Sequence, residues 1–431
     1  MITRLRDYLV KKALVVGPNQ TQTADVLVQD GTISEIKPSI ATLSAIEVIN
    51  GDGLVLLPGF IDIHNHGARG FDFSFGQYDH QSDCFAHTAD VFMTGLRNYL
   101  EHNLTSGTTL LYPTTMAAPI EVLVKSFGWY NDFIHQHPEW SGVLGGINLE
   151  GTFLKDPAYA GAQNPRFFYA PALDLIDELQ KASSKRLSIV NLPPEHGPAG
   201  VELISKMRTQ NIVIAGGHTA AFGDEFLCAV KAGLTLAVHF LNGPSRRSSK
   251  GFRLGGAEEV MLREDNVYLE LICDGYHVHP SYVRDVIARK GLERVIVITD
   301  SMFANGMTNL KHFSLFGLEG EVSAQAEYLQ LKGTEDTLFG SVLSMDVAYQ
   351  NILRWLTNPM TGVWHRHHNA LSLPEALVAG SKMTSTNPAR LLGLDQNYGS
   401  IEPGKKARLL LAQIIPGQEI LFKLKQVFFT S

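Results

Sequence analysis

Eight short apolar segments between residues 59 and 300 set the strongest limit on the fold of this 431-residue chain. Each has the length and β-branched content of a buried strand, and helix-like stretches such as 172–182 and 280–291 lie between them. Strands that alternate with helices form parallel sheets, and eight such units predict a (β/α)8 TIM-like barrel of the α/β class. The segments are 59–66, 108–115, 143–151, 187–195, 212–218, 234–240, 267–274 and 295–300.

The two ends of the chain differ from this middle region. Residues 1–57 and 400–431 contain short β-rich pieces separated by Gly, Asn and Asp turns. We therefore expect one small β-sandwich domain built from both termini, around a barrel domain of residues 58–399. Residues 301–340 interrupt the alternation and predict an antiparallel insertion, after which helical patterns resume.

The composition excludes several classes of partner. Lys and Arg number 36 against 43 Asp and Glu, a net charge of −7, so no broad basic face for nucleic acid is expected. No apolar run approaches the ~18 residues of a membrane-spanning helix. Three scattered cysteines, Cys84, Cys228 and Cys273, suit a reducing compartment, so we expect a cytoplasmic protein that acts on a small molecule.

Histidines and carboxylates follow five of the predicted strands. His64 and His66 are two residues apart on the first strand, so both side chains can face the same side. The carboxyl ends of barrel strands meet on one face, where active sites of this fold lie. Each residue alone has an ordinary structural explanation, such as a helix cap at Asp300. Together they predict a metal site of imidazole and carboxylate ligands, which suits zinc first and also iron(II) or manganese. The predicted ligands are His64, His66, Glu150, His218, His239 and Asp300.

Two other polar clusters have competing interpretations. Arg246, Arg247, Lys250 and Arg253 follow the sixth strand and either bind an anionic substrate group or form a solvated loop. His365, His367 and His368 of WHRHH follow a helix, and a solvated loop is the better interpretation there.

Motifs along nearly the whole chain give a resemblance to a known family. They include PGFIDIHNHG at 58–67, NLEGTFL, GAQNP, AGGHTAA, VHFLNGPS, ICDGYHV, VITDS, LFGSVLSMD and GSIEPGKKA. With these motifs the chain resembles the N-acetylglucosamine-6-phosphate deacetylase family of the amidohydrolase superfamily. The resemblance implies a hydrolase with one or two divalent metal ions, and a homodimer.

The same resemblance implies roles for single residues. Glu150, His218 and His239 match metal ligands, Asp300 matches the catalytic acid and base, and His64 and His66 match a second metal position. The positions that match substrate-binding segments are Ala162, Gln163, Asn242, Gly243, Lys250, Arg253, Tyr276, His277, Phe339 and Gly340.

Departures from the family pattern affect substrate recognition more than hydrolysis. Gln163 stands where the family has His, and it can form hydrogen bonds but cannot become cationic. The phosphate-contacting Arg of the family corresponds to Lys250 or Arg253. Arg408 replaces a usual acidic residue, far from the chemistry. No Lys ends the fourth strand, which argues against relatives that use a carboxylated Lys there.

The predicted reaction is hydrolysis of the acetamido group of an N-acetyl amino sugar. N-acetylglucosamine 6-phosphate is the expected substrate, and glucosamine 6-phosphate and acetate are the expected products. The alternatives are N-acetylgalactosamine-6-phosphate deacetylase, D-aminoacylase, a nucleobase deaminase, and a barrel that binds without catalysis. A scaffold of that kind usually loses its metal ligands, whereas all six are present here.

Overall fold

The computed structural model describes residues 2–42, 46–247, 254–334, 337–417 and 419–429. Eight parallel strands run through its centre, in two sheets ordered β12-β7 and β13-β14-β15-β16-β17-β18. Isolated parallel bridges Thr114–Asn148 and Asn65–Ser301 join the two sheets at both sides, which gives the TIM-like barrel that the sequence predicts. The strands are β7 (Phe60–Asn65), β12 (Thr108–Pro113), β13 (Ile147–Leu149), β14 (Leu187–Asn191), β15 (Val213–Gly216), β16 (Leu234–Ala237), β17 (Tyr268–Ile272) and β18 (Val295–Ile298).

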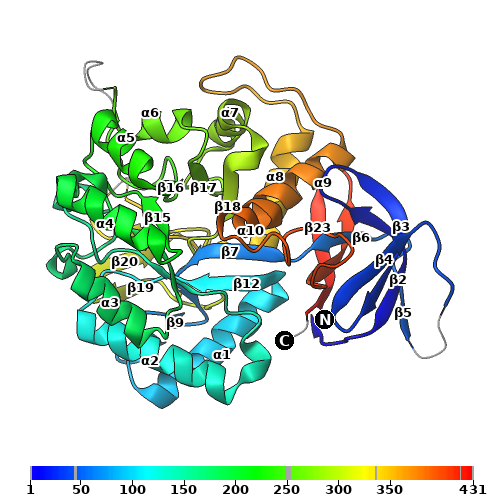
Figure 1. The fold of residues 1–431 in the computed structure, drawn as a ribbon, viewed down its shortest axis with the longest axis horizontal. Coiled ribbons are helices and arrows are strands. Elements are labelled where there is room, and N and C mark those ends of the chain that lie inside the picture. Colours follow the sequence, from blue (N-terminus) through cyan, green and yellow to red (C-terminus); the bar gives the residue numbers. More distant parts are fainter. Residues whose placement is uncertain (1, 43–45, 248–253, 335–336, 418, 430–431) are drawn as a thin grey trace.

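A helix follows each of these strands along the chain, and the helices surround the sheets in Figure 1. Helix α1 shows why: its buried residues Phe92, Leu96, Tyr99 and Leu100 recur on one face, which packs inward. The helices are α1 (Ala89–Thr105), α2 (Ile120–Gln136), α3 (Leu173–Ala182), α4 (Gly197–Thr209), α5 (Gly223–Ala232), α6 (Ala257–Arg263), α7 (Pro280–Lys290) and α8 (Met345–Thr357). Helices α9 (Leu373–Ser381) and α10 (Asn387–Leu391) come after them.

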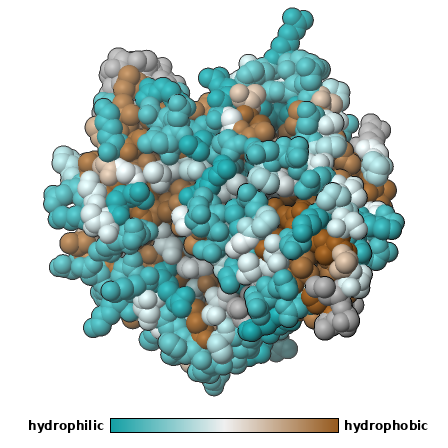
Figure 2. Space-filling model, turned by 45° about the vertical axis from the view of Figure 1, so that its right-hand side comes forward, coloured by the Kyte–Doolittle hydropathy of each residue, from teal (hydrophilic) through white to brown (hydrophobic). Residues whose placement is uncertain are grey.

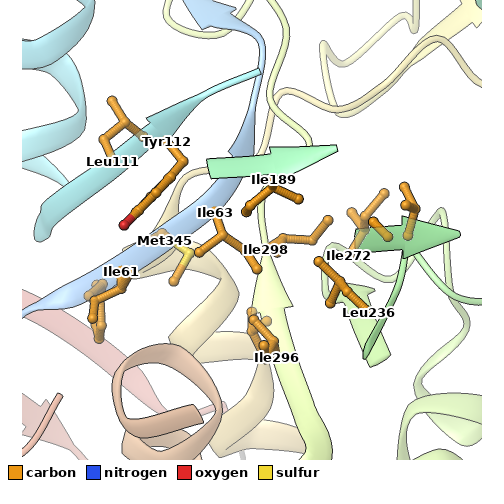
Figure 3. Packing of buried hydrophobic residues seen from close by; sticks show 14 of the residues in the cluster. Ile61, Ile63, Leu111, Tyr112, Ile189, Leu236, Ile272, Ile296, Ile298 and Met345 are labelled. Atoms are coloured by element: carbon orange, nitrogen blue, oxygen red, sulfur yellow. The ribbon is translucent and has the colours of Figure 1, made fainter. Parts of the chain in front are cut away.

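The main hydrophobic core joins the strands to these helices. Figure 3 shows buried side chains of β7, β12, β14, β16, β17 and β18 grouped with Met345 of α8. Ile61, Ile63, Ile296 and Ile298 in this group are no more than 1% exposed. Closely packed branched side chains hold the strands in fixed positions, and this also fixes the positions of the polar residues at the strand ends.

Strands from both ends of the chain form one further sheet, blue and red at the right of Figure 1. Its central junction is the antiparallel pairing of β6 with β22, so strands from both terminal regions lie in one sheet. A second core cluster, with Tyr8, Val26 and Phe428, covers this sheet. Its strands are β1 (Ile2–Thr3), β23 (Leu421–Phe428), β22 (Leu409–Ile415), β6 (Val55–Pro58), β2 (Tyr8–Val16), β3 (Thr21–Gln29), β4 (Thr32–Lys37) and β5 (Glu47–Asn50).

Two antiparallel additions extend the barrel. The predicted insertion in 301–340 is present as β19 (His312–Leu315), β20 (Leu318–Val322) and β21 (Leu329–Leu331). A four-stranded ribbon, which the sequence did not predict, follows β7 directly. It contains β8 (Gly67–Ala68), β9 (Phe71–Asp72), β10 (Gly76–Asp79) and β11 (Cys84–Ala86).

Hydrophilic residues cover much of the face shown in Figure 2, with smaller hydrophobic areas between them. Among the described residues, no helix combines the length and the apolar character needed to cross a membrane.

Candidate active site

The six predicted ligands lie together at the carboxyl ends of the barrel strands. His64 is on β7, and the other five follow β7, β13, β15, β16 and β18 within a few residues. All six are buried, with relative exposures of 1% for His64 and at most 6% for the others. The backbone is left-handed at His218 (φ 50°), His239 (φ 24°) and Asp300 (φ 50°). Such conformations are costly for residues other than glycine and cluster at functional sites, because the surrounding fold must hold them.

One group of ligand atoms forms around Glu150 Oε1. His239 Nε2 lies 3.0 Å and His218 Nε2 lies 3.5 Å from this oxygen. The two imidazole nitrogens are themselves 3.1 Å apart. Three ligand atoms therefore converge on a single point at one side of the carboxylate.

The other oxygen of Glu150 belongs to a second group. Glu150 Oε2 lies 3.6 Å from His64 Nε2 and 3.4 Å from His66 Nε2. Asp300 Oδ1 lies 3.5 Å and 3.1 Å from the same two nitrogens. Glu150 thus stands between the two groups, with one carboxylate oxygen directed to each.

This arrangement fits the chemistry of metal ligation. His64 Nε2 is buried without a hydrogen-bond partner among the described residues, as expected for a nitrogen that offers its lone pair to an ion. Nitrogen and carboxylate donors within 4.8 Å of one another form two overlapping sets, His64–Glu150–His239 and His64–His66–Asp300. Such mixed sets suit zinc and related divalent ions, and Glu150 could contribute one oxygen to each group.

A buried carboxylate that the sequence analysis missed supports these ligands. Glu270 lies within β17 and is 0% exposed. Its Oε2 accepts hydrogen bonds from His64 Nδ1 and from the backbone N–H of His239, each at 3.0 Å. A proton on Nδ1 leaves His64 Nε2 free to bind a metal, so Glu270 fixes both the tautomer and the ring orientation.

The electrostatics keep the carboxylates charged. Burial raises the pKa of Glu150, but the charge of His64 and hydrogen bonds from His218 and His239 outweigh burial and bring that pKa well below its usual value. Burial likewise raises the pKa of Asp300, and a hydrogen bond from His66 with the nearby imidazole charges lowers it overall. Asp300 is therefore ionised at neutral pH and can accept a proton.

A cavity of about 330 Å³ opens above the ligands. It contacts His66, Glu150, His218, His239 and Asp300, and seven more of the residues that line its walls lie on segments discussed above or next to them. These are Ala162, Gln163, Asn242, Gly243, Met302, Phe339 and Gly340. The volume matches that of small-molecule sites.

The other predicted substrate residues are placed differently. Gln163 Nε2 donates to Glu150 Oε2 at 2.8 Å, so this amide also holds a ligand carboxylate. Tyr276 is 46% exposed, and neither it nor His277 is among the described residues that line the cavity. His277 Nδ1 instead hydrogen-bonds Asp274 Oδ2. Lys250 and Arg253 lie outside the described residues.

Comparison with known proteins identifies the family. The sequence profile described as the amidohydrolase family matches residues 55–429. The chain belongs to the amidohydrolase family. Within that family, a relative from Escherichia coli O157:H7 named N-acetylgalactosamine-6-phosphate deacetylase is 29% identical over 383 residues, 89% of each chain. A Homo sapiens relative named N-acetylglucosamine-6-phosphate deacetylase is 30% identical over 369 residues, 82% of this chain and 78% of that protein.

Solved structures give the same fold for this amidohydrolase. The N-acetylglucosamine-6-phosphate deacetylase of Thermotoga maritima has a TM-score of 0.75 and 25% identity, and the alignment covers 98% of this chain and 100% of that one. The Mycobacterium smegmatis enzyme has a TM-score of 0.80 at 23% identity, over 98% of each chain. The family resemblance seen in the sequence motifs is confirmed.

Proposed function

We propose that this amidohydrolase removes the acetyl group of an N-acetyl amino sugar 6-phosphate, with N-acetylglucosamine 6-phosphate as the main candidate. The observation that carries the proposal is the cluster of six histidine and carboxylate side chains, five of which line a single cavity. The names of the relatives support the substrate class. Glucosamine 6-phosphate and acetate would be the products.

The residues present divide the work of amide hydrolysis. Glu150, His218 and His239 would hold one divalent ion, and His64 with His66 would hold a second; zinc is the first candidate, and iron(II) or manganese the others. Such ions, when bound, make water more acidic and polarise a carbonyl. Asp300 then accepts the proton of the attacking water and returns it to the leaving nitrogen, because an amine anion is a poor leaving group.

The cavity walls would orient the sugar. Asn242, Gly243, Ala162, Phe339 and Gly340 line the cavity. Tyr276 and His277 remain candidates from the family resemblance alone, because the described lining of the cavity includes neither. Lys250 or Arg253 remain our candidates for the phosphate.

A second substrate is supported by one comparison. The Escherichia coli relative named for the galactosamine epimer is 29% identical over 89% of this chain, as similar as the glucosamine relatives. The two sugars differ at a single hydroxyl. Acetate release from N-acetylglucosamine, N-acetylgalactosamine and N-acetylmannosamine, each with and without 6-phosphate, tests both proposals. Absence of acetate release from every one of them in zinc-reconstituted protein would contradict the proposed function.

The organisation of the protein completes the proposal. We assign residues 58–399 to the catalytic barrel, and residues 1–57 with 400–431 to a β-sandwich in which the sheet of both termini closes on its own core. We also propose a homodimer in the cytoplasm. Sedimentation at twice the chain mass of 47.4 kDa would support the dimer.

A further inference from the structure

A second cluster of histidines and a carboxylate lies where α7 meets the loop between α8 and α9, orange in Figure 1. Asp285 belongs to α7, and His365 and His368 belong to the loop. Asp285 Oδ1 lies 2.7 Å from His368 Nε2 and 3.0 Å from His365 Nδ1. One ligand atom from each of the three residues lies within 4.8 Å of the others. The solvated loop that the sequence analysis favoured is therefore wrong for His368, which is buried.

The carboxylate of this cluster is buried and oriented. The side chain of Asp285 is 0% exposed, that of His368 7%, and that of His365 39%. Asp285 Oδ2 accepts the backbone N–H groups of Val363 at 2.6 Å and Trp364 at 2.5 Å. These bonds fix the carboxylate so that Oδ1 faces the two imidazoles. A buried anion of this kind is stable only with cationic or strongly donating partners.

The nitrogen-to-oxygen distances of 2.7 and 3.0 Å in this cluster are equal to or shorter than those of the main centre, which run from 3.0 to 3.6 Å. There, His239 Nε2 lies 3.0 Å from Glu150 Oε1, and His66 Nε2 lies 3.1 Å from Asp300 Oδ1. Two imidazoles and one carboxylate are a ligand set that zinc uses in proteins.

The simpler interpretation is that these hydrogen bonds only anchor the loop to α7. Other hydrogen bonds already anchor it, because the neighbouring Arg284 donates to the backbone oxygens of Asn358 at 3.2 Å and Asn369 at 2.7 Å. Anchoring of the loop therefore does not by itself require two imidazoles that converge on a single oxygen.

We propose that Asp285, His365 and His368 form a second metal site, separate from the catalytic centre, that binds zinc or a similar divalent transition ion. The ion would tie the loop to α7 and so have a structural rather than a catalytic role. This inference does not depend on the substrate, so it can fail while the proposed function holds.

The test is the zinc content of purified holoprotein, measured by mass spectrometry after dialysis against zinc and then against buffer. We compare wild type with His365→Gln and His368→Gln, and with His367→Gln as a matched control from the same loop. We expect both cluster variants to contain about one zinc ion fewer per chain than wild type and control, with acetate release retained. Zinc should also raise the Tm of wild type more than that of His365→Gln.

Equal zinc content in wild type and in His365→Gln would overturn the proposal. The cluster would then anchor the loop by hydrogen bonds alone. His368 is buried, so its variant can fail to fold. His365 is partly exposed, and its variant then decides the outcome by itself.

Discussion

At the residue scale, the active site is a set of ionisable side chains that the fold buries. Burial lowers the pKa of His64, yet Glu270 and Glu150 outweigh burial and raise that pKa well above its usual value. Glu150 responds in the opposite direction, and its pKa falls. The carboxylates thus favour the protonated imidazole of His64, and that imidazole favours the ionised form of Glu150. A divalent ion gains from the same carboxylates, because it replaces protons as their counter-charge.

Asp300 is the residue on which catalysis should depend most. Asn keeps its size but cannot move a proton, so we expect Asp300→Asn to lower kcat by about 10²–10⁴-fold, the usual share of general acid–base catalysis. Zinc at Glu150, His218 and His239 should remain. The measurements are kcat, zinc content and Tm of the same preparation, with the exposed Asp132→Asn of α2 as control. A near-normal kcat would remove Asp300 from the mechanism.

Glu270 should act on the metal through His64 rather than on the substrate. Glu270→Gln keeps an acceptor oxygen but loses the negative charge that supports the imidazole, and loss of such partners typically weakens metal affinity 10–100-fold. Chelator competition measures the zinc dissociation constant directly. Glu202→Gln, an exposed change on α4, should leave the constant unaltered. Wild-type affinity in Glu270→Gln would show that the hydrogen bond to His64 has no such role.

At the element scale, local sequence patterns predicted the strands and the residues that end them. His64 and His66 were recognisable because two residues of spacing on a strand place both on one side. Glu270 was missed because it lies inside VYLELICD rather than at its end. A charged residue within a segment that is otherwise apolar was the available signal, since burial of a lone carboxylate is costly without partners.

Other features lay beyond local patterns. His368 is hydrogen-bonded to Asp285, 83 residues earlier in the chain, and the residues around WHRHH do not indicate that contact. The ribbon β8–β11 has strands of two to four residues, too short for alternation to show. The joining of β6 with β22 was predicted only as a shared sheet, because register depends on contacts between distant segments.

Arg408, beside the start of β22, connects the terminal sheet with the barrel. Its guanidinium donates to the backbone oxygens of Thr109 at 3.5 Å and Gly142 at 3.1 Å, and the residue is 6% exposed. Arg408→Met keeps the length but removes both hydrogen bonds, each of which typically contributes about 0.5–1.5 kcal/mol. We expect a lower denaturant midpoint with unchanged KM. The exposed Lys406→Met serves as control, and equal midpoints for the two variants would contradict this role.

At the scale of the whole molecule, the catalytic centre gathers residues that are far apart in the chain. Its ligands run from His64 to Asp300 and come from strands around most of the barrel, β7, β13, β15, β16 and β18. Any ion held there links strands that otherwise meet only through their neighbours. The barrel and the centre would therefore stabilise each other, since the apolar core positions the ligands and a bound ion would balance the charge of the buried carboxylates.

Metal removal should therefore change both activity and stability. A ligand that binds only the folded state stabilises it by about 2.7 kcal/mol at a free concentration of 100 times its Kd. We expect chelation followed by dialysis to abolish acetate release and lower the Tm, and zinc to restore both.

Two variants separate the contributions of the two sites to activity and stability. His365→Gln lacks a ligand only of the cluster with Asp285 and His368, so its activity should still fall on chelation and return with zinc. His218→Asn lacks a ligand of the catalytic centre, so zinc should raise its Tm without restoring activity. This separation follows because the two clusters share no residue. Full activity and an unchanged Tm in protein shown by mass spectrometry to be free of metal would mean that the six clustered side chains act without an ion.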